Sequence, residues 1–296
     1  EKDKRRSRRD FDQALFGHIG YTLSNAARSF VMAATFARFS DAPDTGSTRR
    51  YYQHVNKFSA QCAFATDMAM LTLGGYLKQK EHLSARLGDV LSSLYMASMV
   101  LKHYENQGRP EADLPLVEWS CRTLLYKAQE QLHDFLRNFP NRFIAGAMRL
   151  VIFPRGRTYF AASDRLGRAI VEPLMMPSAT RDRLAWGIYR TVEPGNAIGL
   201  LQEALELSVA TEPLEKRIRV EGVKTGLITA LDLPGQIEQA LAAGLINAAE
   251  AAQLREFDRK VMDIINVDDF SGEELMAAVQ VEPRESGEGA SRLQVA

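Results

Sequence analysis

The spacing of apolar residues predicts helices along almost the whole chain. Phe11, Leu15, Ile19 and Leu23 recur every four residues, which is the repeat of one face of an amphipathic helix. No stretch of the sequence alternates apolar and polar residues with the period of two that marks a strand. The pattern therefore predicts an all-α fold, a multi-helix bundle with long helices in its N-terminal half and shorter helices in its C-terminal half.

The first long helix is expected to end at residues 40–47, which contain a proline and a glycine. Apolar periodicity then continues from Arg49 to about Gly108, and it fits either one long helix or two stacked helices. The Gly74-Gly75 pair inside this run lowers helix propensity by roughly 1 kcal/mol per glycine. These glycines mark either a kink or a close crossing with a neighbouring helix.

A further helix is predicted from about Leu114 to Asn138. Asp113 is expected to be its N-cap, and Pro115 falls in the first turn, where proline is tolerated. Shorter candidate helices follow at 143–153, 164–175, 178–187, 196–211, 213–224, 233–243 and 248–266.

The order of these patterns predicts one helical domain in two parts. Residues 11–140 form a long-helix bundle, and residues 141–267 form a short-helix part of the same domain. Residues 1–10, with six bases and three acids, are interpreted as a charged linker. Residues 268–296 are acidic and are expected to be mostly disordered.

Composition narrows the function classes. The 296 residues include 37 Lys and Arg against 37 Asp and Glu, so the net charge is zero and we expect no nucleic-acid partner. The two cysteines, Cys62 and Cys121, are too few for a disulfide framework, which indicates a reducing compartment and a cytoplasmic location. The longest apolar runs, 68–77 and 94–101, fall short of the roughly 18 residues of a membrane-spanning helix.

The sequence carries no local motif for catalysis. It lacks the GxSxG, GxGxxG and GxxxxGK[ST] patterns, so neither a nucleophilic serine nor a phosphate loop is predicted. The histidines lie on separate predicted helices without paired spacing, so no metal site is predicted either. These histidines are His18, His54, His82, His103 and His133.

Two features rise above this background. Asp67 lies on a mostly apolar helix face, where a buried carboxylate must be paired or protonated; it is a general base or, as we favour, a partner of a neighbouring helix. Arg155 and Arg157 lie on a turn and are candidates for an anion site, such as one for phosphate. Pairing of these arginines with surface acids is the favoured alternative.

The segment 86–101 is rich in apolar and small residues, which indicates close helix packing. Its sequence does not distinguish a core within one chain from a contact between subunits.

Several long strings carry a resemblance to a known family. They include GRPEADLPLVEW at 108–119, NFPNRFIAGAMRLVIFPRGRTYFAASD at 138–164 and INVDDF at 265–270. Together with residues 51–98, these strings resemble the C-terminal region of bacterial FadE-type acyl-CoA dehydrogenases. Residues 78–101 are also similar, more weakly, to the helical C-terminal extension of mitochondrial very-long-chain acyl-CoA dehydrogenase.

The resemblance implies a parent enzyme that oxidises acyl-CoA to trans-2-enoyl-CoA in fatty-acid β-oxidation. In that family a glutamate removes the α-proton while FAD accepts the β-hydride. The glutamate motif and the glycine-rich flavin segment are both missing here, so the resemblance carries over no catalytic or FAD-binding residue. The chain begins at Glu1 rather than methionine, and we expect a C-terminal fragment that is inactive alone.

The resemblance also implies partners. Acyl-CoA and FAD would reach this domain through the dehydrogenase core, and a homodimer and a peripheral contact with the inner face of the cytoplasmic membrane are expected. The domain would stabilise the core, contribute a subunit contact or dock the enzyme on a membrane. The alternative is a free-standing helical interaction or membrane-docking module without enzymatic activity.

Overall fold

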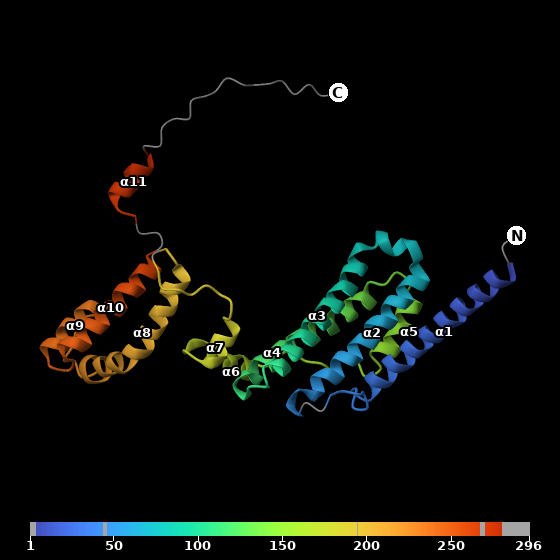
Figure 1. Ribbon diagram of the computed structural model, residues 1–296, viewed down its shortest axis with the longest axis horizontal. Helices are drawn as coiled ribbons and strands as arrows, with labels where there is room; N and C mark the ends of the chain where they lie inside the picture. Colours follow the sequence, from blue (N-terminus) through green and yellow to red (C-terminus); the bar gives the residue numbers. More distant parts are fainter. Residues whose placement is uncertain (1–3, 44–45, 194, 267–269, 280–296) are drawn as a thin grey trace, which may run out of the picture. The chain divides into compact units, whose positions relative to one another are not determined.

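The computed structural model describes residues 4–43, 46–193, 195–266 and 270–279. The structure is 77% helical, with 11 α-helices and no strand within those ranges, which confirms the all-α prediction. The chain forms two compact units, Glu1–Leu184 (unit 1) and Ala185–Ala296 (unit 2). Figure 1 shows the long helices α1 to α4 in the first half of the chain and shorter helices after α8.

Unit 1 is a helical bundle in which α2 contacts α1, α3 and α4, while α5 packs on α1 and α4. Its centre contains the fully buried side chains of Phe58, Leu101, Leu125, Phe135 and Met148. Burial of each such side chain stabilises the fold by about 1.5–3 kcal/mol. The elements of unit 1 are α1 (Lys4–Ala34), η1 (Gly46–Thr48), α2 (Arg49–Leu73), η2 (Gly74–Gln79), α3 (Glu81–Asn106), η3 (Glu111–Asp113), α4 (Leu114–Arg137), α5 (Arg142–Ile152), α6 (Asp164–Met175) and α7 (Ala179–Leu184).

The apolar run from Arg49 to Gly108 forms two helices, α2 and α3, rather than one. Gly74 ends α2 with a φ of 51°, a left-handed conformation that glycine adopts without steric cost. The short 3-10 helix η2 then joins the two α-helices, which pack against each other. The glycine pair therefore marks a chain reversal rather than a kink within one helix.

Asp113 is at the N-cap position of α4, as predicted, but its side chain does not cap the helix. The carboxylate instead accepts hydrogen bonds from Thr180 Oγ1 at 2.5 Å and from Arg183 Nη2 and Nε at 2.6 and 2.8 Å. A charged bidentate pair is stronger than a cap to a backbone amide, so Asp113 ties α7 to the start of α4.

Unit 2 contains α8 (Ala197–Arg217), the π-helical turn η4 (Ile218–Val223), α9 (Leu233–Ala242), α10 (Ala248–Ile265) and α11 (Gly272–Val279). A small core joins α8, η4, α9 and α10 through Leu214, Ile218, Ile237 and Leu254. The predicted break at Pro213 is wrong, because α8 runs through this residue. The buried side chains of Leu214 and Ile218 directly after it favour a continuous helix, and tertiary packing outweighs the local cost of proline.

Both ends of the chain differ in part from the expected pattern. The charged segment expected as a linker is helical from Lys4, where it forms the exposed first turns of α1; lysine and arginine are good helix formers. The acidic tail contains α11, and residues 267–269 and 280–296 lie outside the described residues. None of the described helices is long and apolar enough to span a bilayer.

Candidate functional site

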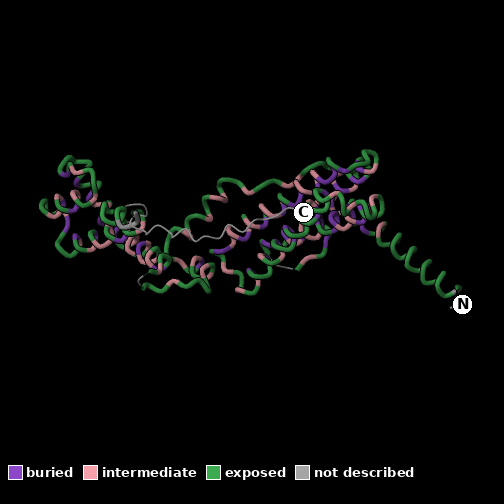
Figure 2. The backbone as a smooth tube through the Cα atoms, turned by 90° about the horizontal axis from the view of Figure 1, so that it is seen from above, coloured by how far each residue is buried: buried purple, intermediate pink, exposed green. Residues whose placement is uncertain are grey.

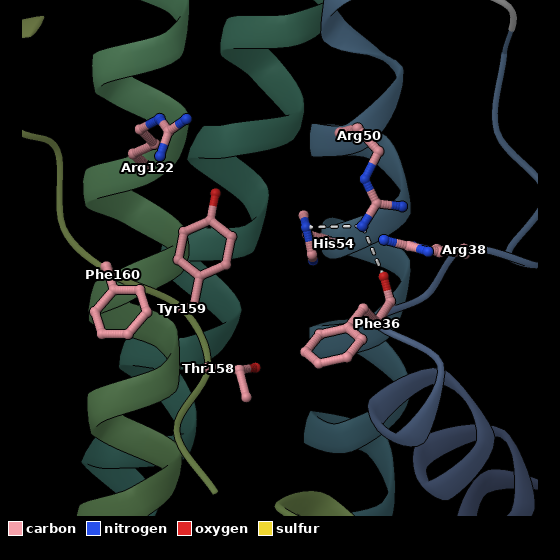
Figure 3. Close-up of a pocket in the computed structure, with 8 residues that line it drawn as sticks. All are labelled: Phe36, Arg38, Arg50, His54, Arg122, Thr158, Tyr159 and Phe160. Atoms are coloured by element: carbon pink, nitrogen blue, oxygen red, sulfur yellow. Dashed lines mark hydrogen bonds between the residues drawn. The ribbon is translucent and has the colours of Figure 1, made fainter. Parts of the chain in front are cut away.

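Unit 1 contains a pocket of about 340 Å³ between α2, α4, the turn after α1 and the connection from α5 to α6 (Figure 3). Three arginines and one histidine line it, and no acidic side chain is found among its described lining residues. The lining residues are Phe36, Arg38, Arg50, His54, Arg122, Thr158, Tyr159 and Phe160. We call this cavity the arginine pocket.

The turn after α1 forms one wall of the arginine pocket. Phe36 and Ala37 have φ values of 53° and 57°, and each such conformation costs a non-glycine residue about 1–3 kcal/mol. Side chains of α2 hold this turn: Arg50 Nη2 donates to the Phe36 carbonyl at 2.8 Å (Figure 3). Gln53 Nε2 donates to the Arg38 carbonyl at 3.2 Å. These bonds fix the positions of Phe36 and Arg38 at the pocket.

Two hydrogen bonds between Gln129 on α4 and the backbone of Tyr159 hold the opposite wall of the pocket. Gln129 Nε2 donates to the Tyr159 carbonyl, and the Tyr159 backbone N–H donates to Gln129 Oε1, both at 2.9 Å. The Tyr159 ring meets the His54 ring edge-on at 5.1 Å and the Phe58 ring at 6.0 Å between centroids. Because Gln129 and Phe58 are fully buried, Tyr159 is anchored on the bundle core.

Burial and neighbouring cations lower the pKa values of Arg50, His54 and Lys57, whereas Tyr51, Tyr159 and Glu118 raise the pKa of Arg122. Burial, followed by repulsion from Lys57, Arg50 and Arg122, lowers the pKa of His54 to about 3, so the imidazole is neutral near pH 7. Burial and Arg50 lower the pKa of Lys57 to about 8. His54 Nδ1 is buried and has no hydrogen-bond partner among the described residues. The pocket is thus a region of unbalanced positive charge.

The two arginines predicted as an anion site take different positions. The Arg155 guanidinium lies over the Phe36 ring at 5.2 Å, beside the arginine pocket. Arg157 donates to Glu130 at 2.7 Å in an exposed ion pair. The structure therefore does not bring them together as one site, and their role in anion binding stays a prediction.

Asp67 has the structural partners that its apolar surroundings predict. It is buried on α2, accepts a hydrogen bond from Thr22 Oγ1 and lies 3.3 Å from His18 Nε2, both on α1. The pairing interpretation of Asp67 is confirmed, and it joins α1 to α2. In the described part of the chain, no three His, Cys, Asp or Glu side chains group as a metal site would require.

Sequence reasoning missed the pocket arginines. Arg38, Arg50 and Arg122 come from three separate segments, and none belongs to a short motif. The nearest signal is local: Arg50 and His54 lie one helical turn apart on α2, so their side chains share a face.

The fold and its pocket define an all-α domain in which a cationic cavity is held between helices. The chain belongs to the bacterial-type acyl-CoA dehydrogenase C-terminal family, whose model matches residues 1–270. No solved structure matches the chain significantly. The family match confirms the resemblance found in the sequence.

Proposed function

We propose that this chain is the C-terminal helical domain of an FAD-dependent acyl-CoA dehydrogenase and that it stabilises the enzyme by packing against the dehydrogenase region. The enzyme would convert acyl-CoA to trans-2-enoyl-CoA, the first step of fatty-acid β-oxidation. The family match over residues 1–270 supports the enzyme class. The packing role rests on the surface of α1.

The first half of α1 exposes a stripe of large apolar side chains. Phe11, Phe16 and Leu23 are 65%, 68% and 65% exposed, and Leu15 and Ile19 between them are also exposed. Figure 2 shows the N-terminal half of α1 running beyond the rest of unit 1, exposed along its length. Exposed apolar patches of this kind mark interaction surfaces, and helices gain most of their stability from packing. The dehydrogenase region of the same enzyme is the proposed occupant.

The chemistry is assigned to the dehydrogenase region rather than to this domain. The arginine pocket, at about 340 Å³, is too small to enclose a whole flavin dinucleotide, and the family resemblance carries over no flavin-binding residue. We propose that the chain alone binds no FAD and does not oxidise acyl-CoA.

Co-expression of the chain with the dehydrogenase region of its enzyme tests the packing role. We expect the two parts to co-purify with bound flavin and acyl-CoA oxidation, and the chain alone to be colourless. The double variant Phe11→Ser, Phe16→Ser should reduce co-purification at least tenfold. Phe143→Ser is the matched control, because Phe143 is 91% exposed on α5, away from the stripe. Equal co-purification of the double variant and the control would contradict the proposal.

A second role, membrane docking, is supported by the last turn of α2 and the connection from α2 to α3. Met70, Leu71 and Tyr76 are 61%, 55% and 49% exposed there, and the Lys80 ammonium lies 4.9 Å from the Tyr76 ring centroid. Apolar side chains beside lysines suit the surface of an anionic membrane. The chain should float with phosphatidylglycerol vesicles at low salt, and Met70→Ser, Leu71→Ser should abolish this. Failure of the unmodified chain to float would rule the role out.

The segment 86–101 supports a subunit contact in addition to its place in the core. Leu87, Val90 and Leu94 are buried in the bundle, whereas Leu91 and Tyr95, on the flank of that buried face of α3, are 64% and 65% exposed. We propose this exposed stripe as the homodimer contact. Light scattering of Leu91→Ser, Tyr95→Ser should show a monomer where the unmodified chain is a dimer; a monomeric unmodified chain would contradict the proposal.

A further inference from the structure

The arginine pocket gathers cations that the described residues leave without a carboxylate. Elsewhere in unit 1, Arg109, Arg157 and Arg183 form ion pairs at 2.5 to 2.7 Å. In each of these pairs a carboxylate balances the charge of the guanidinium. The arginines of the pocket differ from these three in having no such carboxylate among the described residues.

Among the described residues, none of the three pocket arginines has an ion pair within 4 Å. Arg50 is held by neutral groups, the Phe36 carbonyl, Gln53 and His54. The nearest acid to act on Arg122 is Glu118, which lies one turn earlier on α4 and beyond ion-pair distance. Each guanidinium carries five N–H donors, so unused donors remain for a ligand.

The positive charges of these side chains repel one another, which is unfavourable. Burial and the positive charge of Arg38 lower the pKa of Arg50, and the same field acts on His54 and Lys57. Lys57 is only 4% exposed, so little solvent screens its charge. A bound anion would remove this repulsion.

Phosphate matches this site better than a carboxylate does. A carboxylate brings one negative charge, whereas a phosphate monoester brings about 1.5 to 2 and a diphosphate brings more. Planar guanidinium groups bind phosphate oxygens in pairs. The rings of Phe36, Tyr159 and Phe160 lie beside the cations, and Phe160 is 75% exposed, so a flat base has a surface to stack on.

We propose that the arginine pocket binds the diphosphate group of a nucleotide-type ligand. The guanidinium groups of Arg38, Arg50 and Arg122 would contact the phosphate oxygens, and the base would stack on the aromatic side chains. Its volume of about 340 Å³ is within the range of small-molecule sites. The proposal depends on the pocket alone and not on the packing role of α1.

Calorimetric titration of the whole chain in chloride buffer tests this binding, with ADP and inorganic pyrophosphate as probes. We expect both to bind, with ADP the tighter because only ADP has a base to stack. Arg38→Gln should weaken ADP binding about tenfold or more, which is the usual effect of losing one charged hydrogen bond. Arg38→Lys, which keeps the charge, should recover part of the loss.

The control is Arg149→Gln, which removes the same charge from an exposed position on α5 outside the pocket. Arg38 is the decisive position, because in the described part of the chain no hydrogen bond of its side chain supports the fold. Circular dichroism of Arg38→Gln should therefore show an unchanged helix content. Absence of binding by both probes would overturn the proposal, as would equal losses in Arg38→Gln and Arg149→Gln. Binding to phosphatidylglycerol vesicles alone, without ADP binding, would also overturn it.

Discussion

Two charged clusters in unit 1 differ in how their charges are balanced. At the start of α4, Asp113 accepts from Thr180 and from Nε and Nη2 of Arg183, so the cluster is complete within the chain. In the arginine pocket, Arg38 and Arg50 approach each other without a described carboxylate. The first arrangement holds a helix in place. The second gathers cations without a carboxylate among the described residues, and we propose that a nucleotide diphosphate balances them.

Near neutral pH, removing the carboxylate from the balanced cluster should have the largest effect. Asp113→Ala leaves two donors without their acceptor, and we expect the free energy of unfolding of unit 1 to fall by about 2 kcal/mol. Since Arg183 lowers the pKa of Asp113, the contribution is present above the unfolded pKa near 3.8 and is lost as the pH falls through the lower folded value. Urea unfolding in a Trp186→Phe background, where Trp119 reports on unit 1, measures this effect.

Asp134→Ala is the control for Asp113→Ala. Asp134 is half exposed, and its ion pair with Arg137 is long, at 4.0 Å. Its removal should therefore change the free energy of unfolding by less than about 0.5 kcal/mol. A loss as large as that of Asp113→Ala would contradict the distinction between the clusters.

Acid should destabilise the unbalanced cluster through His54. Its folded pKa of about 3 lies below the unfolded value of 6.5, so the unfolded chain binds the extra proton between these values. The free energy of unfolding therefore falls as the pH falls from 6.5 towards 3, by up to about 1.4 kcal/mol per pH unit. His54→Gln should flatten this slope, while His82→Gln, at an exposed position on α3, should not. Equal slopes in the two variants would contradict the buried, neutral state of His54.

Removing a cation from the empty arginine pocket should have the smallest effect. Arg38→Gln loses no described side-chain hydrogen bond and relieves repulsion on Arg50. We expect a change in the free energy of unfolding within about 0.5 kcal/mol, in the stabilising direction. A loss above about 1 kcal/mol in urea unfolding would show that Arg38 serves the fold.

Helices and local pairs could be predicted because their physics is local. The helix predicted at 164–175 forms as α6, Asp164–Met175, and the apolar neighbours of Asp67 indicate its pairing. The side chain of Asp113 and the break at Pro213 were misjudged because distant contacts outweigh local preference. The partners of Asp113 lie some 70 residues away, and the core contacts of Leu214 keep α8 continuous through the proline.

The arginine pocket could not be predicted in this way. Its residues come from α2, α4, the turn after α1 and the connection after α5, and each arginine alone looks like an ordinary surface residue. Only the packing of these segments brings the charges together. Of the two arginines predicted as an anion site, Arg155 lies beside the arginine pocket, because its turn packs beside Phe36.

The protonation of His54 with and without a nucleotide tests the unbalanced pocket most directly. Histidine ring resonances of the whole chain can be followed by NMR through an acid titration, with ADP added and withheld, and assigned with His54→Gln. Without ADP, His54 should stay neutral down to a pKa of about 3. With ADP, the bound negative charge should raise the pKa of His54 by about one unit or more. An unchanged pKa in saturating ADP would contradict the arginine pocket as an anion site.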